Sequence, residues 1–266
     1  MGGNGNRSNL NIAFFLIVSL FLTAYQVQAD EEIGFSYIES SGRGPSKWGE
    51  LDPKWKACGF GKLQSPVDIS SQNVRVDHGL GELHQQPYKP VNATILSRGR
   101  DIMVAWKGDA GGININGTSY NLEHSHWHIP SEHSINGTRY DLELHIVHVN
   151  PQRNVAVIGI LYRYGQPDPF LSKLLPYIKS VTKKEKNLGT INPGIMELGT
   201  RKYYRYNGSL SVPPCTEGVI WTILDKVGSV SVDQVEALRN AVDSGFQMNA
   251  RPIQPLNGRG LYLYNP

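Results

Sequence analysis

Residues 121–149 read NLEHSHWHIPSEHSINGTRYDLELHIVHV, and this segment holds six of the eight histidines in the chain. Its second half, residues 139–148, alternates between apolar and polar positions as a β-strand does. Three apolar residues share one face of that strand, and Glu143, His145 and Val147 share the other. We therefore expect a strand with one face in the core and a second face that carries chemistry.

The first half of the segment carries alternating histidines at His124, His126 and His128. All three point to the same side of a strand, and the outer two stand roughly 13 Å apart at the usual rise per residue. Because the ligand nitrogens of one metal ion lie close together, one ion cannot bind all three. The chelating pair is therefore either His124 with His126 or His126 with His128.

A third ligand must come from an adjacent strand. His145 suits this role because the same strand face carries Glu143 and Val147. Neutral imidazole is the nitrogen ligand that zinc prefers, and three protein ligands leave a fourth position for water, as in catalytic sites. The alternative is that these histidines are ordinary core or surface residues with satisfied hydrogen bonds.

The rest of the chain indicates a large sheet. Short β-rich runs recur between Gly, Pro and Asn turns, and Asn-Gly pairs at 116–117 and 136–137 predict hairpins. The expected strands cover 94–96, 102–106, 112–115, 119–122, 142–149, 155–162, 202–206 and 219–227.

Two segments predict helices at the edges of the sheet. Ser231 and Gln234 fit a capping box, so we expect a helix over 231–244 that Gly245 closes. Asp168-Pro169 can open a short helix that Pro176 would interrupt.

Composition and charge are those of a globular protein. Apolar residues make up 39% and charged residues 18% of the chain, which is ordinary for a protein with a real core. The formal net charge of +3, without clustered basic and aromatic residues, argues against nucleic-acid binding. No repeats or linkers interrupt the mature chain, so we expect one catalytic domain over residues 30–266.

The N-terminus has the pattern of a secretory signal peptide over residues 1–29. Arg7 supplies a positive charge, residues 12–24 are almost entirely apolar, and Val27-Gln28-Ala29 has small residues at the cleavage spacing. The apolar run is short of the roughly 20 residues of a stable membrane span; an uncleaved anchor is the alternative. We expect a secreted, extracellular protein, or one that reaches a plastid or another compartment through the secretory route.

Two further features agree with secretion. The chain has two cysteines, Cys58 and Cys215, and an isolated pair in an oxidising compartment usually forms a disulfide; two free buried thiols are the alternative. The mature part also has four glycosylation sequons. They lie at Asn92, Asn116, Asn136 and Asn207.

Two motifs closely resemble the metal-binding signature of α-carbonic anhydrases. They are HWHIPSEH at 126–133 and DLELHIVH at 141–148, and the short form of the first is similar to the plant branch. Three further segments match the family in the same order along the chain. They are QSPVDI at 64–69, GSLSVPPC at 208–215 and NARP at 249–252. Together the motifs span nearly the whole mature chain.

The resemblance implies a mainly β single domain, with short helices at the edges of a central twisted, mostly antiparallel sheet of about ten strands. It implies zinc as the cofactor, with His126, His128 and His145 as its ligands. It implies supporting roles around the metal for three further residues. These are His124, Glu143 and Asn249. It also places Cys58 and Cys215 where secreted members of the family form a disulfide.

The implied activity is the reversible hydration of CO2 to bicarbonate and a proton. Zinc lowers the pKa of its bound water to about 7, so hydroxide is available to attack CO2 at neutral pH. By the resemblance, Ser211 accepts the hydroxide proton and donates its own to Glu132, which orients the nucleophile. The implied substrate pocket consists of Val147, Val157, Leu210, Val212, Val219 and Trp221.

Four positions depart from the common family pattern. Ser211 keeps the hydroxyl of the usual threonine, Val212 loses a hydrogen-bonding group, and His124 replaces a common glutamine. Arg100 matches the position of the proton-shuttle histidine in the fastest members. Because arginine stays protonated in proteins, it cannot relay a proton at neutral pH. We therefore expect an active but slow enzyme.

Two other functions compete with this one. A family member can be kept for storage, ligand binding or protein interaction rather than catalysis. The same hydroxide can also attack activated esters, which we regard as a side activity.

Overall fold

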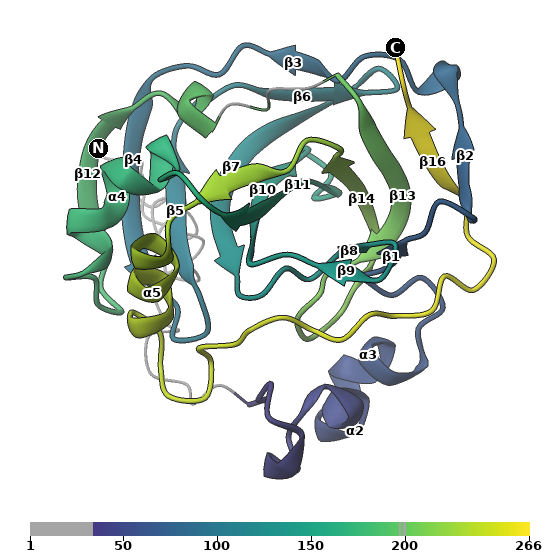
Figure 1. Cartoon of the computed structure of the whole chain (residues 1–266), viewed down its shortest axis with the longest axis horizontal. Coiled ribbons are helices and arrows are strands. Elements are labelled where there is room, and N and C mark those ends of the chain that lie inside the picture. Colours follow the sequence, from purple (N-terminus) through teal and green to yellow (C-terminus); the bar gives the residue numbers. More distant parts are fainter. Residues whose placement is uncertain (1–33, 197, 199–200) are drawn as a thin grey trace, which may run out of the picture. The chain divides into compact units, whose positions relative to one another are not determined.

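One large twisted sheet organises residues 34–196, 198 and 201–266, which are the residues that the computed structural model describes (Figure 1). The sheet has 13 strands. In chain order they are β2 (Val74–Val76), β3 (His84–Gln86), β4 (Val91–Ser97), β5 (Ile102–Lys107), β6 (Gly112–Ile115), β7 (Thr118–His128), β10 (Leu142–Val149), β11 (Val155–Tyr164), β12 (Lys186–Ile191), β13 (Tyr203–Ser209), β14 (Glu217–Leu224), β15 (Gly228–Val230) and β16 (Leu261–Tyr264).

The main path of the sheet runs β12-β4-β5-β7-β10-β11-β14-β13-β16-β2. Its ladders are antiparallel except for β11 with β14 and β16 with β2. A separate small sheet combines three short strands. They are β1 (Asp68–Ile69), β8 (Ser134–Ile135) and β9 (Thr138–Arg139). The expected fold class, a mainly β protein with a large, mostly antiparallel sheet, is confirmed.

Helices are short and lie at the edges of the sheet (Figure 1). The α-helices are α2 (Trp48–Leu51), α3 (Lys56–Phe60), α4 (Pro169–Ile178) and α5 (Val232–Asn240). The 3-10 turns are η1 (Glu39–Ser41), η2 (Pro45–Lys47), η3 (Pro53–Trp55), η4 (His78–Leu80) and η5 (Pro193–Met196). None of the described helices is long and apolar enough to span a bilayer.

The alternation in β10 sorts its side chains as the sequence predicts. Leu144 and Ile146 enter the larger core cluster, together with apolar residues of α4 and α5. Val147 enters a second cluster on the opposite face, around Trp221 and Tyr206. Because apolar side chains cover both faces, β10 is almost entirely buried, as a central strand must be. The face that carries chemistry is therefore enclosed as well.

Helix α5 begins as predicted but ends earlier. Ser231 is the N-cap, and its capping box with Gln234 is complete. The helix stops at Asn240 instead of continuing to Ser244, because the next turn bonds elsewhere: the Asp243 N–H donates to the Gly99 carbonyl at 2.7 Å. Gly245, with a φ of 89°, lies beyond the helix and does not cap it.

The expectation that Pro176 interrupts α4 is wrong. The helix continues to Ile178, with Pro176 in its last turn. Proline there removes one intrahelical hydrogen bond. The apolar side of α4, which includes Leu174 and Ile178, is fully buried against the sheet, and this packing maintains the helical path.

The two cysteines form a disulfide, so the alternative of free thiols is wrong. Cys58 of α3 is bonded to Cys215, in the loop between β13 and β14, across a sequence separation of 157 residues. Both are buried in a small cluster with Phe35, Trp48 and Phe246. The disulfide therefore attaches the N-terminal helices to the loop that contains Ser211.

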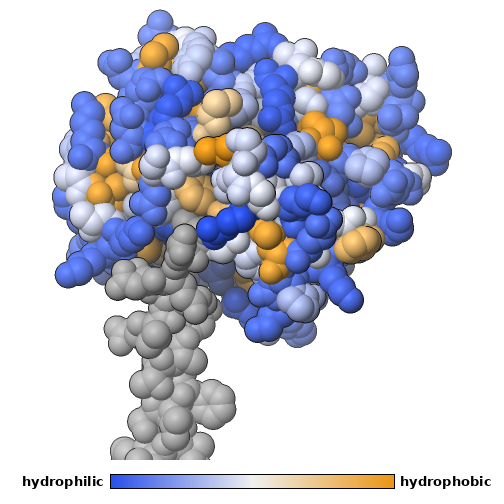
Figure 2. All heavy atoms as spheres, turned by 90° about the horizontal axis from the view of Figure 1, so that it is seen from below, coloured by the Kyte–Doolittle hydropathy of each residue, from blue (hydrophilic) through white to orange (hydrophobic). Residues whose placement is uncertain are grey.

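The surface is mixed. Figure 2 shows a face that is mostly hydrophilic, with apolar residues in separate spots. All four sequon asparagines are exposed. The predicted signal peptide lies outside the described residues.

Candidate metal centre

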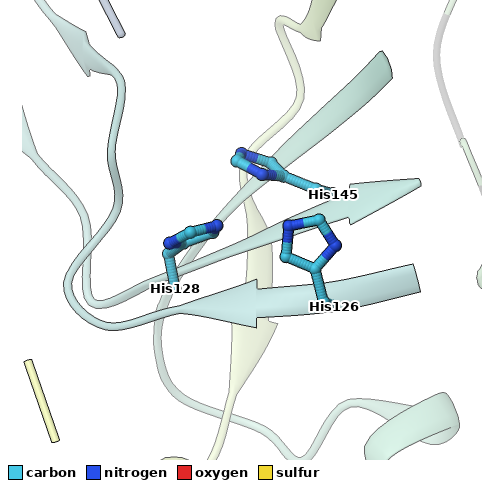
Figure 3. A group of neighbouring side chains, drawn as sticks. All are labelled: His126, His128 and His145. Atoms are coloured by element: carbon cyan, nitrogen blue, oxygen red, sulfur yellow. The ribbon is translucent and has the colours of Figure 1, made fainter. Parts of the chain in front are cut away.

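Three histidines converge from two neighbouring strands (Figure 3). His126 and His128 lie on β7, and His145 lies on β10 directly opposite His126 in the antiparallel ladder. One ring nitrogen from each lies within 4.8 Å of those of the other two. The spacing argument left two chelating pairs open; the pair of this group is His126 and His128, and His124 is outside it.

Hydrogen bonds commit one nitrogen in two of the rings and leave the other free. The Nδ1 of His128 is 2.8 Å from the Asn249 carbonyl oxygen, which can only accept, so Nδ1–H is the donor. Nε2 of His128 is then a lone-pair nitrogen, and it is buried without a partner. In His145 the order is reversed: Nε2 lies 2.8 Å from Glu143 Oε1, and Nδ1 stays free. Such fixed tautomers are typical of metal-ligating histidines.

The resemblance implied that His124 supports His126, and in the structure the two residues meet through their rings. The His124 ring stacks on the His126 ring, with centroids 5.3 Å apart, and its Nδ1 contacts Glu123 Oε2 at 3.2 Å. No hydrogen bond joins the two rings in the described structure, and Nδ1 of His126 is buried without a partner. His124 therefore supports His126 by ring contact rather than by the hydrogen bond that a glutamine would offer.

Burial favours the neutral form of two of the three imidazoles, His126 and His145. It lowers the pKa of His126 well below its usual value, and the nearby positive charge of Arg98 adds to this effect. Burial also lowers the pKa of His145, against the opposing effect of Glu143. Metal ions compete with protons for ring nitrogens, so neutral imidazoles are the form that binds a cation.

Glu143 makes hydrogen-bond contacts with several groups of the site at once. Its Oε2 accepts from the backbone N–H groups of Glu132 and His133, both at 2.8 Å, and its Oε1 contacts His133 Nδ1 at 2.7 Å as well as His145. Burial alone would raise the pKa of Glu143, but the facing imidazoles of His133 and His145 lower it well below its usual value. Glu143 is therefore a carboxylate that fixes the His145 ring.

A chain of buried polar groups continues behind Glu143, and the sequence prediction did not include it. Nε2 of His133 lies 2.7 Å from the Tyr206 hydroxyl, which donates to Ser65 Oγ at 2.8 Å. His133 lies inside the histidine-rich segment, which was a usable signal. Tyr206 had none, because it is 73 residues from His133 and meets it only through the pairing of strands.

Glu132 offers one free acceptor. It is fully buried, and its Oε1 accepts from the Arg251 N–H at 2.9 Å, while Oε2 has no partner. Ser211 is buried as well, but within the described residues no hydrogen bond joins it to Glu132. The acceptor that the expected Ser211–Glu132 contact requires is present, and the contact itself is not formed.

Most of the predicted pocket residues gather in one apolar cluster beside the histidines. Val147, Val157, Val219 and Trp221 are buried there, and Leu210 packs against them. The Trp221 ring lies 4.8 Å from the His145 ring, between centroids. Val212 differs, because it packs against the cluster around the disulfide.

Asn249 connects the site to the turn that carries Arg100. Its side-chain oxygen accepts from the Ile129 N–H at 2.8 Å, and its Nδ2 donates to the Arg100 carbonyl at 2.8 Å. Together with the His128 contact, these bonds connect Asn249 to the histidine group and to the turn that carries Arg100. The side chain of Arg100 is 27% exposed.

Comparison with known proteins decides the family. The family model of the eukaryotic-type carbonic anhydrase matches residues 43–265, almost all of the described chain. This chain belongs to the α-carbonic anhydrase family. It is 51% identical to alpha carbonic anhydrase 4 of Arabidopsis thaliana over 239 residues, which cover 90% of this chain and 89% of that protein.

Solved structures of similar proteins agree. A dioscorin complexed with ascorbate superposes with a TM-score of 0.84 at 43% identity, covering 89% of this chain and 98% of that one. The α-carbonic anhydrase of Thermovibrio ammonificans, in complex with sulfanilamide, superposes with a TM-score of 0.77 at 33% identity, covering 87% of this chain and 100% of that one.

The histidine group fits the metal of this family. α-Carbonic anhydrases are zinc enzymes, and the group of His126, His128 and His145 could hold a metal ion. The buried, unpaired nitrogen of His128 is the observation that a cation would explain, since unsatisfied buried polar atoms are costly.

Proposed function

We propose that this chain catalyses the reversible hydration of CO2 to bicarbonate and a proton, with zinc held by His126, His128 and His145. The observation that carries the proposal is the convergence of three imidazoles, each with one ring nitrogen within 4.8 Å of those of the other two. Zinc bound there would supply a water with a pKa near 7, hence a nucleophile at neutral pH.

We propose that Ser211 and Glu132 orient the reaction. Glu132 Oε2 is a buried acceptor without a donor, and a hydroxyl that donates to it keeps only its lone pairs for the reacting oxygen. In this arrangement Ser211 Oγ would accept a hydrogen bond from the attacking oxygen and direct a lone pair of that oxygen toward the substrate, a positioning effect. The apolar cluster around Val147 and Trp221 suits CO2, which has neither charge nor dipole.

The proposed rate limit is proton release, because Arg100 takes the shuttle position. A purified mature protein should hydrate CO2 in stopped-flow assays, lose activity with a chelator, and speed up as buffer concentration rises. Arg100→His should raise kcat about tenfold at low buffer concentration, less than the roughly 10²–10⁴-fold that an optimised general acid–base group contributes. His128→Ala, which removes a ligand, is the inactive control.

Two results would contradict this account. If the zinc-loaded protein does not hydrate CO2, the proposed enzymatic function is wrong. If the wild-type rate does not depend on buffer concentration and Arg100→His has the same kcat as the wild type, the shuttle explanation is wrong. The proposed enzymatic function would still stand.

Ligand binding without catalysis is the second candidate. It has one specific support, which is the likeness to a dioscorin that is complexed with ascorbate. The same CO2 assay distinguishes the two functions, because a protein that only binds ascorbate would show no CO2 turnover.

We also propose that the protein is secreted, with residues 1–29 removed. The disulfide is consistent with an oxidising compartment. The four exposed sequons at Asn92, Asn116, Asn136 and Asn207 are accessible for glycosylation.

A further inference from the structure

The turn between β4 and β5 brings two arginines to the metal centre. Met103 of β5 pairs with His126 of β7, so Asp101, two residues earlier in this antiparallel ladder, lies level with His128. Asn249 also bridges the turn to the same histidine, since it accepts from His128 Nδ1 and donates to the Arg100 carbonyl, each at 2.8 Å. The backbone of Arg100 is therefore two hydrogen bonds away from a proposed ligand.

One of the two arginines, Arg98, has a carboxylate partner within hydrogen-bond distance. Nε and Nη2 of Arg98 donate to Oδ1 and Oδ2 of Asp101 at 2.6 and 2.8 Å. Asp101 is 3% exposed. Burial would raise its pKa, but the charges of Arg98 and Arg100 prevail and lower it to about 2. Arg98 and Asp101 therefore form a bidentate ion pair with no net charge.

The other arginine, Arg100, has no carboxylate within hydrogen-bond distance among the described residues. Arg100 Nε lies 3.6 Å from Asp101 Oδ2, beyond hydrogen-bond distance, and is buried without a partner. No hydrogen bond from its guanidinium is formed in the described part of the chain, and part of the side chain is exposed. Two guanidinium groups thus share one carboxylate, which leaves one uncompensated positive charge.

The neighbours of Arg100 do not supply the missing negative charge. Burial raises the pKa of Tyr37 well above its usual value, so this hydroxyl is neutral. The buried carboxylate of Glu132 accepts from the Arg251 N–H at 2.9 Å and has the positive charge of Arg251 beside it, and no ion pair joins it to Arg100 in the described residues.

We propose that Arg100, braced by the Arg98–Asp101 pair, is an anion subsite beside the metal centre that takes small carboxylate-type oxyanions, including bicarbonate. The proposal rests on the proposed function for the identity of its natural ligand. A planar guanidinium with free N–H groups matches two oxygens of such an anion. CO2 is uncharged and gains nothing from this residue, so Arg100 distinguishes the product from the substrate.

Acetate is the probe that tests the subsite. Its affinity for the zinc-loaded mature protein is measured by titration calorimetry, which does not depend on turnover. Arg100→Gln should weaken acetate binding about tenfold, the size of one lost charge-assisted hydrogen bond. Arg100→Lys keeps the charge and should lose less. Lys89→Gln, which removes an exposed charge paired with Asp109, is the matched control and should bind acetate as the wild type does.

Equal acetate affinity in the wild type and in Arg100→Gln would overturn the proposal, as would a wild type that binds no acetate. Circular dichroism of each variant shows whether it is folded. If Arg100→Gln is not folded, the acetate affinity of Arg100→Lys is compared with that of the wild type instead. CO2 hydration is measured separately on the same samples. Loss of catalysis with Arg100-dependent acetate binding would refute the proposed function and leave the subsite standing.

Discussion

His148 shows at the residue scale how position decides what a histidine does. It is only three residues from His145, but the ladder of β10 with β7 shifts register between Val147 and His148. His148 is fully buried, and its Nε2 lies 3.0 Å from the hydroxyl of Tyr88, whose ring stacks on it. This histidine has a structural role, although it belongs to the same sequence motif as His145, a proposed metal ligand.

The burial of His148 predicts a pH dependence of stability. Burial lowers its pKa to about 3. Below its ordinary pKa of about 6.5 the unfolded chain binds a proton there that the folded chain does not, so the free energy of unfolding falls on acidification. Between about pH 6.5 and 3 this residue should account for about 1.4 kcal/mol per pH unit.

Urea unfolding at several pH values measures this slope. His148→Gln cannot titrate, so its free energy of unfolding should fall less steeply between pH 6 and 4 than that of the wild type. His78→Gln, at an exposed histidine, is the control. If His148→Gln keeps the wild-type slope, another group causes the acid sensitivity.

Gln234 acts at the scale of elements, because it joins two helices. It completes the capping box of α5, and its Oε1 also accepts from the Asp168 N–H at 2.8 Å, at the start of α4. Its Nε2 donates to the Asp168 carbonyl at 2.8 Å and to Ser172 Oγ at 2.9 Å. The side chain is 2% exposed, so these bonds have no water to replace them.

This double role predicts unequal costs for the two capping-box residues. Ser231→Ala loses one cap and should lower the free energy of unfolding by about 1 kcal/mol. Gln234→Ala also removes its three hydrogen bonds to Asp168 and Ser172 and should cost about 2–4 kcal/mol. Urea unfolding of both variants compares them, and equal costs would mean that the link between the helices contributes nothing.

The elements also show where local patterns are overruled. Alternation and turn residues predicted the central strands well, because each is decided within a few neighbouring residues. Pro176 and Gly245 were misjudged, since burial of α4 and the bond from Asp243 to Gly99 involve residues far away in the chain. The pair β8 and β9 is the hairpin that Asn136-Gly137 predicted, whereas β1 was not predicted, because two residues carry too little pattern.

At the scale of the whole molecule, the disulfide is the longest covalent constraint. It closes a loop between residues 157 positions apart. In the chain-entropy model, such a loop stabilises the folded state by about 4–5 kcal/mol. The double variant Cys58→Ser/Cys215→Ser should therefore unfold at a clearly lower urea concentration than the wild type, and an unchanged midpoint would show that the constraint is dispensable.

Zinc binding should also stabilise the whole domain. Free zinc at 100 times its Kd adds about 2.7 kcal/mol to the free energy of unfolding, because the unfolded chain has no assembled site. Calorimetry should show a higher Tm with zinc and a lower one after chelation. His128→Ala should lose this response, while His78→Ala should keep it. A Tm that zinc does not change would contradict the metal site.

The sequence by itself determined the alternating strand faces, the capping box, the cysteine pair and a histidine cluster, in which spacing left the chelating pair open and the family resemblance selected His126 and His128. The first three of these properties depend on residue spacing within one or two elements. Only the tertiary structure decided which ring nitrogens are committed to hydrogen bonds, that His124 stacks on His126, and that Arg100 Nε has no hydrogen-bond partner. Those properties depend on contacts such as that of His128 with Asn249, 121 residues away, and such contacts form only when the sheet brings distant segments together.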